Sequence, residues 1–171
     1  MSAPRKLRPY QLLMERFPLG KRRVNLWAGM GLGKTVSVAT SVAALALIAD
    51  DALPVLVVAP TAVARSVWKQ EIMGWDHLKH LRVNVMLGSA VERRAALRGI
   101  ADVYVINYEN LQWLEHECRG GKWPFRTVIA DESTFLKSFR LKQGGARAAS
   151  LARFAHSCVR RWINLTGTPA E

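Results

Sequence analysis

The residues from Ala28 to Thr35 read Ala-Gly-Met-Gly-Leu-Gly-Lys-Thr, which is the composition and spacing of a phosphate-binding loop. Glycines let the backbone turn its N–H groups inward around a polyphosphate, where a side chain would block the approach or forbid a positive φ. The loop has three such positions: Gly29, Gly31 and Gly33. Lys34 provides a point charge for the terminal phosphates, and the Thr35 hydroxyl is a ligand for a Mg²⁺ ion that bridges them.

The residues on either side supply the context that such a loop needs. The apolar run Val24–Trp27 precedes it, and the segment Val36–Ala49, rich in Ala, Leu and Val, follows it. Strand, glycine-rich loop and helix is the order that this motif requires. Ala28 stands where the usual pattern begins with glycine, and it is a small substitute. The alternative is a glycine-rich turn followed by a surface lysine, and the flanking signals argue against it.

Two adjacent acids, Asp131 and Glu132, directly follow the apolar run Thr127–Ala130. Ligands of parallel α/β sheets bind at the carboxyl ends of the strands, so both carboxylates are expected at the ligand edge. In a nucleotide hydrolase the first acid would hold Mg²⁺, usually through water, and the second would orient and deprotonate the attacking water. A strand that simply ends in solvated acids is the alternative, which the upstream phosphate loop disfavours.

Six apolar runs are expected to be strands: Val24–Trp27, Val55–Ala59, Val83–Leu87, Val103–Asn107, Thr127–Ala130 and Trp162–Thr166. The segments between most of them have helical character: Val36–Ala49, Ala62–Met73, Ser89–Arg98, Asn107–Glu117 and Gly145–Ser157. Strands that alternate with helices predict an α/β fold, with a mostly parallel central sheet and helices on both faces. A chain of 171 residues fits one domain, so we expect residues 1–171 to form a single unit.

The net charge of +12 predicts attraction to a polyanion. The excess is uneven, because residues 133–170 contain no Asp or Glu and many Lys and Arg. Nucleic acid is the leading candidate, and an acidic protein partner is the main rival. Charge of this kind positions a protein on phosphates without reading bases, so it gives no sequence specificity.

Composition excludes several other classes. Half of the residues are apolar, which excludes a disordered chain, and no stretch is long and apolar enough to span a bilayer, so no membrane partner is expected. The basic N-terminus lacks the apolar core of a secretory signal. Cys118 and Cys158 are too few for a disulfide framework, and a reducing cytoplasm, with the protein free or associated with DNA, fits best. Neither cysteine has its nearby histidine at a common zinc spacing.

The tryptophans could stack on bases or pack inside the protein. Trp27 and Trp162 lie in expected strands, which predicts burial in the core. The other four allow either role, with burial in amphipathic segments as the default: Trp68, Trp75, Trp113 and Trp123.

Several short strings occur along the chain in one order: Arg8-Pro9-Tyr10-Gln11, the loop 28–35, Ala59-Pro60-Thr61 with Trp68 and Glu71, Ile106-Asn107-Tyr108-Glu109, Asp131-Glu132 with Leu136-Lys137, and Leu165-Thr166-Gly167-Thr168-Pro169. This ordered set resembles the first RecA-like lobe of superfamily-two helicases, most closely the Swi/Snf-type branch. The resemblance spans residues 7–171. The chain departs from it where Ser133-Thr134 replaces the usual Ala-His or Ala-Asp, and where the branch has an acidic residue beside Gly29.

The resemblance implies a role for particular positions. Gln11 would recognise the adenine edge of ATP, because an amide can both donate and accept a hydrogen bond. It also assigns the β/γ-phosphates to Lys34, the metal to Thr35 and Asp131, and the catalytic base to Glu132. The string at 165–169 would couple the nucleotide state to movement on nucleic acid through Thr166 and Thr168. Four residues lie in segments resembling those that touch the nucleic-acid backbone: Thr61, Arg65, Asn107 and Tyr108.

Three functions are compatible with these residues. The first is the ATP-binding motor lobe of a helicase or translocase acting on DNA, and the family resemblance implies duplex more than single-stranded DNA. Because helicases of this type take arginine fingers from a second lobe and this chain ends after Leu165–Pro169, we expect it to bind ATP better than it hydrolyses it. The second is a single-lobe module that binds nucleic acid or a partner and regulates or decoys another helicase. A different P-loop ATPase fits the loop but not the Leu-Thr-Gly-Thr-Pro string.

Overall fold

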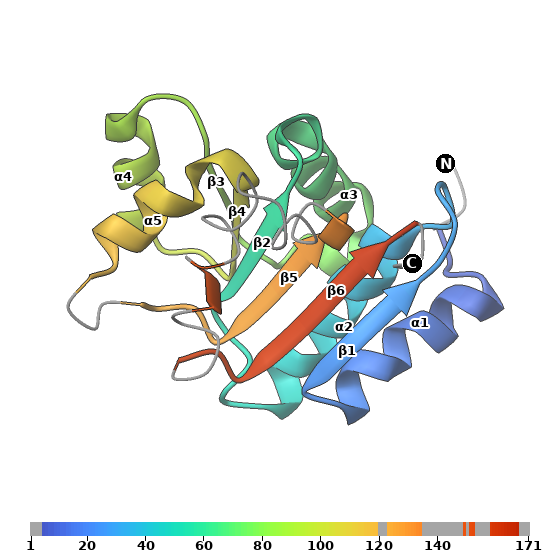
Figure 1. Ribbon diagram of the computed structural model, residues 1–171. Coiled ribbons are helices and arrows are strands. Elements are labelled where there is room, and N and C mark those ends of the chain that lie inside the picture. The colour runs from blue at the N-terminus through green and yellow to red at the C-terminus, as the bar shows by residue number, and fades with distance from the viewer. Residues whose placement is uncertain (1–4, 120–122, 135–148, 150, 153–157, 168–171) are drawn as a thin grey trace.

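A six-stranded parallel sheet forms the centre of the molecule (Figure 1). The computed structural model describes residues 5–119, 123–134, 149, 151–152 and 158–167. The strand order is β1-β6-β5-β2-β4-β3. The strands are β1 (Arg23–Trp27), β2 (Val55–Ala59), β3 (Val83–Met86), β4 (Val103–Asn107), β5 (Thr127–Asp131) and β6 (Arg161–Thr166). Each predicted strand is confirmed, with bounds that differ by at most one residue.

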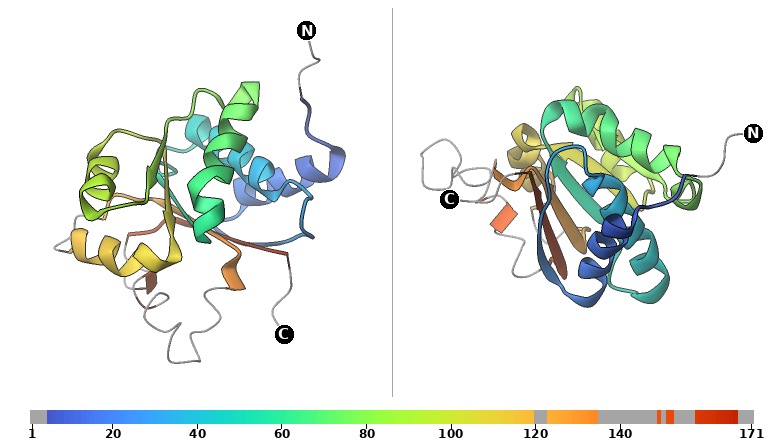
Figure 2. Two further views of the ribbon diagram at one scale, coloured as in Figure 1. Left: turned by 90° about the horizontal axis from the view of Figure 1, so that it is seen from above. Right: turned by 90° about the vertical axis from the view of Figure 1, so that its right-hand side faces the viewer.

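Helices cover both faces of the sheet, as the sequence predicts (Figures 1 and 2). Helices α1 and α2 pack on each other on the face that α3 also covers, and α5 packs on the opposite face. The helices are α1 (Pro9–Gly20), α2 (Lys34–Ile48), α3 (Trp68–Gly74), α4 (Ala90–Arg98) and α5 (Leu111–Glu117). Three short turns of other helix types complete the set: a π-helix, η1 (Val63–Val67), and the 3₁₀-helices η2 (Asp76–Leu78) and η3 (Tyr108–Asn110).

Burial of the strands follows their position in the sheet. The three strands β2, β4 and β5 are buried at every position, because helices lie over both of their faces. The edge strand β1 alternates between exposed and buried positions. Its inward residues Val24 and Leu26 join the core, whereas Trp27 is 64% exposed. The expectation that Trp27 is a core residue is therefore wrong, while Trp162 is half-buried and packs against the core.

The local sequence explains several helix boundaries. Ser89 caps α4 in a capping box, since the N–H of Glu92 donates to the Ser89 hydroxyl (3.3 Å) and the N–H of Ser89 donates to the Glu92 carboxylate (2.7 Å). Helix α1 was not expected, because its large apolar side chains do not form a buried stripe: only Gln11 and Pro18 are buried in it. The expected helix Gly145–Ser157 lies almost wholly outside the described residues.

Across the residues that the structure describes, no helix is long and apolar enough to cross a membrane.

Candidate nucleotide and metal site

The loop from Ala28 to Gly33 joins the carboxyl end of β1 to the first turn of α2. Gly31 and Gly33 have φ values of 75° and 73°, so both lie in the left-handed region that favours glycine. A Cβ atom on Gly33 would also lie only 2.1 Å from the side-chain Nε2 of Gln11. The chain therefore needs glycine here for two reasons, and the loop places the amino end of a 15-residue helix at the sheet edge. Such an end is a favourable site for an anion.

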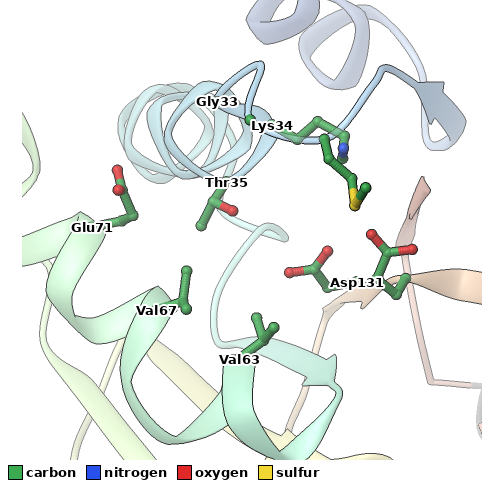
Figure 3. Close-up of a pocket in the computed structure, with 10 residues that line it drawn as sticks. Gly33, Lys34, Thr35, Val63, Val67, Glu71 and Asp131 are labelled. Atoms are coloured by element: carbon green, nitrogen blue, oxygen red, sulfur yellow. The ribbon is translucent and has the colours of Figure 1, made fainter. Parts of the chain in front are cut away.

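A cavity of about 300 Å³ lies between this loop, helix α3 and the end of β5 (Figure 3). Val63 and Val67 of η1 project into it opposite Thr35 (Figure 3). Its walls combine the loop, the π-helix and the two acids: Met30, Gly31, Gly33, Lys34, Thr35, Val63, Val67, Glu71, Asp131 and Glu132. The structure thus brings together Lys34, Thr35, Asp131 and Glu132, which the sequence analysis drew from two distant segments.

Lys34 lies folded over its own loop. Its ammonium donates to the carbonyl oxygens of Ala28 (2.7 Å) and Gly29 (3.0 Å). These two oxygens are neutral acceptors, whereas a phosphate oxygen is charged and forms a stronger hydrogen bond with an ammonium. An anion at this loop would therefore compete with the two carbonyl oxygens for the Lys34 ammonium, which a side-chain rotation could turn toward it.

Asp131 is a buried carboxylate with two aromatic residues around it. The indole N–H of Trp68 donates to its Oδ2 (2.8 Å), and the hydroxyl of Tyr108 donates to its backbone carbonyl (2.7 Å). Burial raises the pKa of the Asp131 carboxyl, and the hydrogen bond from Trp68 opposes that rise. Burial likewise raises the pKa of the Tyr108 phenol, which keeps Tyr108 a neutral donor. The sequence leaves the role of Trp68 open, and no local signal in it connects Tyr108 with Asp131.

Glu132 has a φ of 52° and is the one residue other than glycine with a positive φ in the described parts of the chain. A non-glycine residue in this region is uncommon and costs roughly 1–3 kcal/mol, which the surrounding structure must offset. A Cβ on Gly167, after β6, would lie 3.9 Å from Glu132 Oε1. The Glu132 carboxylate therefore lies near the residue that directly follows β6.

The cavity suits a hard divalent cation. The Thr35 hydroxyl and the Asp131 carboxylate are oxygen donors, the kind that Mg²⁺ prefers, and both line the same cavity. Within the described ranges no three His, Cys, Asp or Glu side chains gather to hold a metal alone. Mg²⁺ is usually held by one or two protein ligands, with phosphates and water completing its coordination. Of the two His-x-Cys pairs, His116 with Cys118 lies within the described residues, whereas His156 lies outside them.

Gln11 lies against the phosphate loop and is 8% exposed. Its Oε1 accepts the backbone N–H of Arg8 (2.8 Å), and its Nε2 donates to the carbonyl of Leu32 (3.2 Å). The bond to Leu32 ties α1 to the loop, and the bond from Arg8, at the start of α1, helps to hold the amide in place. A second cavity of about 390 Å³ lies beside it, lined by Arg5, Lys6, Arg8, Tyr10, Gln11, Gly31 and Trp75.

Two of the four candidate nucleic-acid residues are hydrogen-bonded to each other. The Asn107 amide donates to the Thr61 hydroxyl (2.9 Å), which joins the ends of β4 and β2. The Thr61 hydroxyl donates in turn to Glu109 (3.0 Å), and Arg65 is exposed on the π-helix that follows. The Tyr108 side chain is fully buried, so it presents no surface to a nucleic acid. We correct that candidate: Tyr108 belongs to the surroundings of Asp131.

Of the two coupling candidates, Thr166 lies within the described residues and Thr168 does not. Thr166 ends β6 beside the loop, is 3% exposed, and its carbonyl accepts the backbone N–H of Ala28 (3.3 Å). The string at 165–169 is therefore adjacent to the phosphate loop at Thr166. Thr168 lies outside the described residues, as do Leu136 and Lys137.

Comparison with known sequences gives matches over nearly the whole chain. A family model described as the SNF2-related domain matches residues 25–171. The putative protein p41 of Acyrthosiphon pisum secondary endosymbiont phage 1 is 50% identical over 95% of this chain and 35% of its own length. The SWI/SNF-related matrix-associated actin-dependent regulator of chromatin subfamily A-like protein 1 of Bos taurus is 34% identical over 96% of this chain and 16% of its own length. This chain thus spans a minor part of the curated relatives it matches.

Solved structures share the fold. The SWI2/SNF2 ATPase core of Sulfolobus solfataricus in complex with double-stranded DNA has a TM-score of 0.72 and 23% identity, covering 96% of this chain and 32% of that one. A hypothetical ATP-dependent RNA helicase from Sulfolobus tokodaii has a TM-score of 0.71 and 21% identity, covering 99% and 48%. At these identities the similarity establishes the fold, which is the RecA-like α/β arrangement expected from the sequence.

Proposed function

This chain belongs to the SNF2-related domain family, and on that premise we propose that it is the ATP-binding N-terminal motor lobe of a DNA helicase or translocase. The observation that carries the proposal is the meeting of Lys34, Thr35, Asp131 and Glu132 around one cavity. These four side chains supply a phosphate-binding cation, two metal ligands and a base. A nucleotide triphosphate with Mg²⁺ is the ligand that uses all of them.

The residues of the chain divide the work of the reaction. The loop N–H groups and Lys34 bind and orient the β- and γ-phosphates. Thr35 and Asp131 would hold Mg²⁺, which when bound neutralises charge on the phosphates. The Glu132 carboxylate accepts a proton from the attacking water. Gln11, fixed beside the loop, would select adenine at the neighbouring cavity.

The lining of this cavity is also the reason to expect slow hydrolysis of ATP by this chain alone. Lys34 is the one basic side chain among its lining residues in the described structure, and no arginine reaches it there. An arginine finger is worth about 10³–10⁵ in turnover where it has been measured. We therefore propose that ATP binds well and that efficient hydrolysis requires an arginine from a second lobe or a partner protein.

DNA is the proposed polymer on which the lobe acts. The net charge of +12 favours a polyanion, and a structural relative is described in complex with double-stranded DNA. Thr61 and Arg65 are exposed just beyond β2, and the buried Asn107 at the end of β4 donates to the Thr61 hydroxyl. Arg65 belongs to the π-helix whose Val63 and Val67 line the nucleotide cavity. This arrangement would let one sheet edge contact both ligands.

The substitution Glu132→Gln tests the proposed function. It keeps the size of the side chain but removes the base, so we expect the affinity for ATP to stay within about twofold and turnover to fall by about 10²–10⁴. Nucleotide binding is measured by fluorescence titration with a labelled ATP, and phosphate release is measured with and without duplex DNA.

Glu15→Gln is the matched control, because Glu15 lies on α1 and does not line the nucleotide cavity. It should leave both quantities unchanged. Under a condition in which the wild type turns over measurably, equal turnover by Glu132→Gln would contradict the assignment of the base. Binding of ATP with no turnover by the wild type under any condition would favour the regulatory single-lobe alternative.

A further inference from the structure

Asp131 is held by two aromatic donors that belong to different elements. Trp68 begins α3 and reaches the carboxylate, and Tyr108 begins η3 and reaches the backbone carbonyl of the same residue. Trp68 is 1% exposed and Tyr108 is 0% exposed. Water does not compete with either hydrogen bond at that burial, so each fixes the position of Asp131 strongly.

Both aromatic residues continue segments that carry candidate nucleic-acid contacts. Trp68 follows the π-helix that contains Arg65, and that helix begins shortly after Thr61. Tyr108 directly follows Asn107, whose amide donates to the Thr61 hydroxyl (2.9 Å). The two segments are therefore joined at one end by the exposed Thr61 and the buried Asn107, and at the other end by Asp131.

The π-helix between these points also forms part of the nucleotide cavity. Val63 and Val67 point into the cavity (Figure 3). Arg65, between them in sequence, is exposed. Ala64 is fully buried, and its N–H donates to the carbonyl of Pro60 (2.8 Å). Single π-turns inside helices are rare and often occur at functional sites. A displacement of this turn by nucleic acid would move a wall of the cavity and the donor to Asp131 together.

Two other buried aromatic donors in the described structure bond outside the nucleotide site, and a third, Trp75, donates its indole N–H to the carboxylate of Glu71 (3.1 Å), which lines the same cavity. Trp123 donates to the backbone carbonyl of Phe125 (3.0 Å), and Tyr104 donates to that of Gly99 (2.5 Å). Any buried Trp or Tyr needs some acceptor, so these two satisfy an ordinary packing requirement. Trp68 and Tyr108 both converge instead on one residue of the nucleotide site.

We propose that Trp68 and Tyr108 are positioning residues that orient Asp131 toward the metal and couple nucleic-acid binding to the nucleotide site. The proposal rests on the function proposed above, because it takes Asp131 as a metal ligand. Trp68 acts on the carboxylate and so on metal affinity. Tyr108 holds the backbone carbonyl of Asp131. When nucleic acid displaces the segment at Asn107, Tyr108 therefore moves with that segment and shifts Asp131.

Trp68→Phe tests the first half, with Trp123→Phe as the matched control. Each change keeps a buried ring and removes one indole N–H. We titrate labelled ATP in the presence of excess chelator and again in the presence of Mg²⁺. Trp68→Phe should leave the metal-free affinity unchanged and reduce the gain from Mg²⁺ by about tenfold, as loss of a residue that supports a metal ligand does. The control should match the wild type in both titrations.

If Mg²⁺ raises the affinity for ATP equally in Trp68→Phe and in the wild type, the proposed role of Trp68 is overturned. If Trp68→Phe does not fold, the wild type answers the question through the indole N–H resonances, assigned with ¹⁵N-labelled single Trp→Phe variants of the other tryptophans. Addition of Mg²⁺ to the ATP-bound protein should shift the Trp68 resonance and leave that of Trp123 in place. Equal shifts, or no shift at Trp68, would overturn it.

Tyr108→Phe tests the coupling, with Tyr104→Phe as its control. The affinity for ATP with Mg²⁺ is measured without DNA and with a saturating short DNA duplex. Coupling between two sites is reciprocal and typically amounts to about 5–150-fold, so DNA should change the affinity of the wild type and of Tyr104→Phe by such a factor. In Tyr108→Phe the factor should fall towards one, while the affinity for DNA alone stays within about twofold.

The proposed coupling would be overturned if DNA changed the affinity for ATP by the same factor in Tyr108→Phe and in the wild type. It would also be overturned if DNA did not change that affinity in the wild type. Failure of the proposed function gives a different result. If the wild type binds no ATP, or if Mg²⁺ adds nothing to its affinity, then the nucleotide site itself is misassigned. The two failures are therefore distinguished by the wild-type titrations alone.

Discussion

At the scale of single residues, the site depends on backbone conformations as much as on charged groups. Gly33 illustrates this, since it combines a φ of 73° with the close approach of Gln11. The same glycine allows the amide of Gln11 to reach the loop carbonyl of Leu32. Glu132, with its φ of 52°, is the corresponding point on the other side of the cavity. Both conformations aim groups at the space where phosphates are proposed to bind.

Gly33→Ala should weaken the protein and the site together. A left-handed conformation costs a non-glycine residue roughly 1–2 kcal/mol, and the new Cβ would displace Gln11. We expect the melting temperature to fall by about 2–8 °C, measured by calorimetry, and the affinity for ATP to fall at least about tenfold.

Gly20→Ala is the matched control for this change. A Cβ at Gly20 would meet no atom within 4 Å, and its φ is not positive. It should leave both the melting temperature and the ATP affinity near the wild-type values. A Gly33→Ala protein that behaves like this control would show that the loop does not need its left-handed turn.

At the scale of elements, local pattern predicted the sheet well and the buried connections poorly. All six strands followed from apolar runs, because strands covered on both faces are continuously apolar. Lys34, Thr35, Asp131 and Glu132 were found because their spacing and their place after strands are local signals. Exposure of Trp27 was missed, since the edge position of β1 depends on pairing with β6, far along the chain.

The sequence also could not predict that Trp68 and Tyr108 both donate hydrogen bonds to Asp131. Trp68 and Tyr108 lie 63 and 23 residues from Asp131 along the chain, and each looks locally like an ordinary core aromatic. Their donors meet one residue only because β2, β4 and β5 are neighbours in the sheet. Helix α1 was missed for a different reason, because its apolar side chains are partly exposed and give no amphipathic period.

At the scale of the whole molecule, the positive charge and the placement of the two proposed ligands act together. The excess of 25 Lys and Arg over 13 Asp and Glu attracts a polyanion, and the parallel sheet collects its functional residues at one edge. Nucleic acid drawn to this surface would then meet segments that also border the nucleotide cavity.

DNA binding should therefore depend steeply on salt. When a protein neutralises several phosphates, the logarithm of its affinity for DNA falls linearly with the logarithm of the salt concentration. The slope of that line is close to minus the number of phosphate contacts. For duplex DNA we expect the slope of log affinity against log salt concentration to be about −3 or steeper, measured by fluorescence anisotropy between low and physiological salt. A flat response would contradict an interface made by the basic surface.

The central claim is that the loop from Ala28 to Thr35 binds the phosphates of ATP, and Lys34 gives its most direct test. The measurement is the dissociation constant of ATP with Mg²⁺ for the wild type, for Lys34→Ala and for Lys79→Ala, an exposed lysine that pairs with Asp76. Loss of a charged hydrogen bond predicts an affinity about 10- to 100-fold weaker in Lys34→Ala and unchanged in Lys79→Ala. Equal affinities in all three proteins would contradict the account.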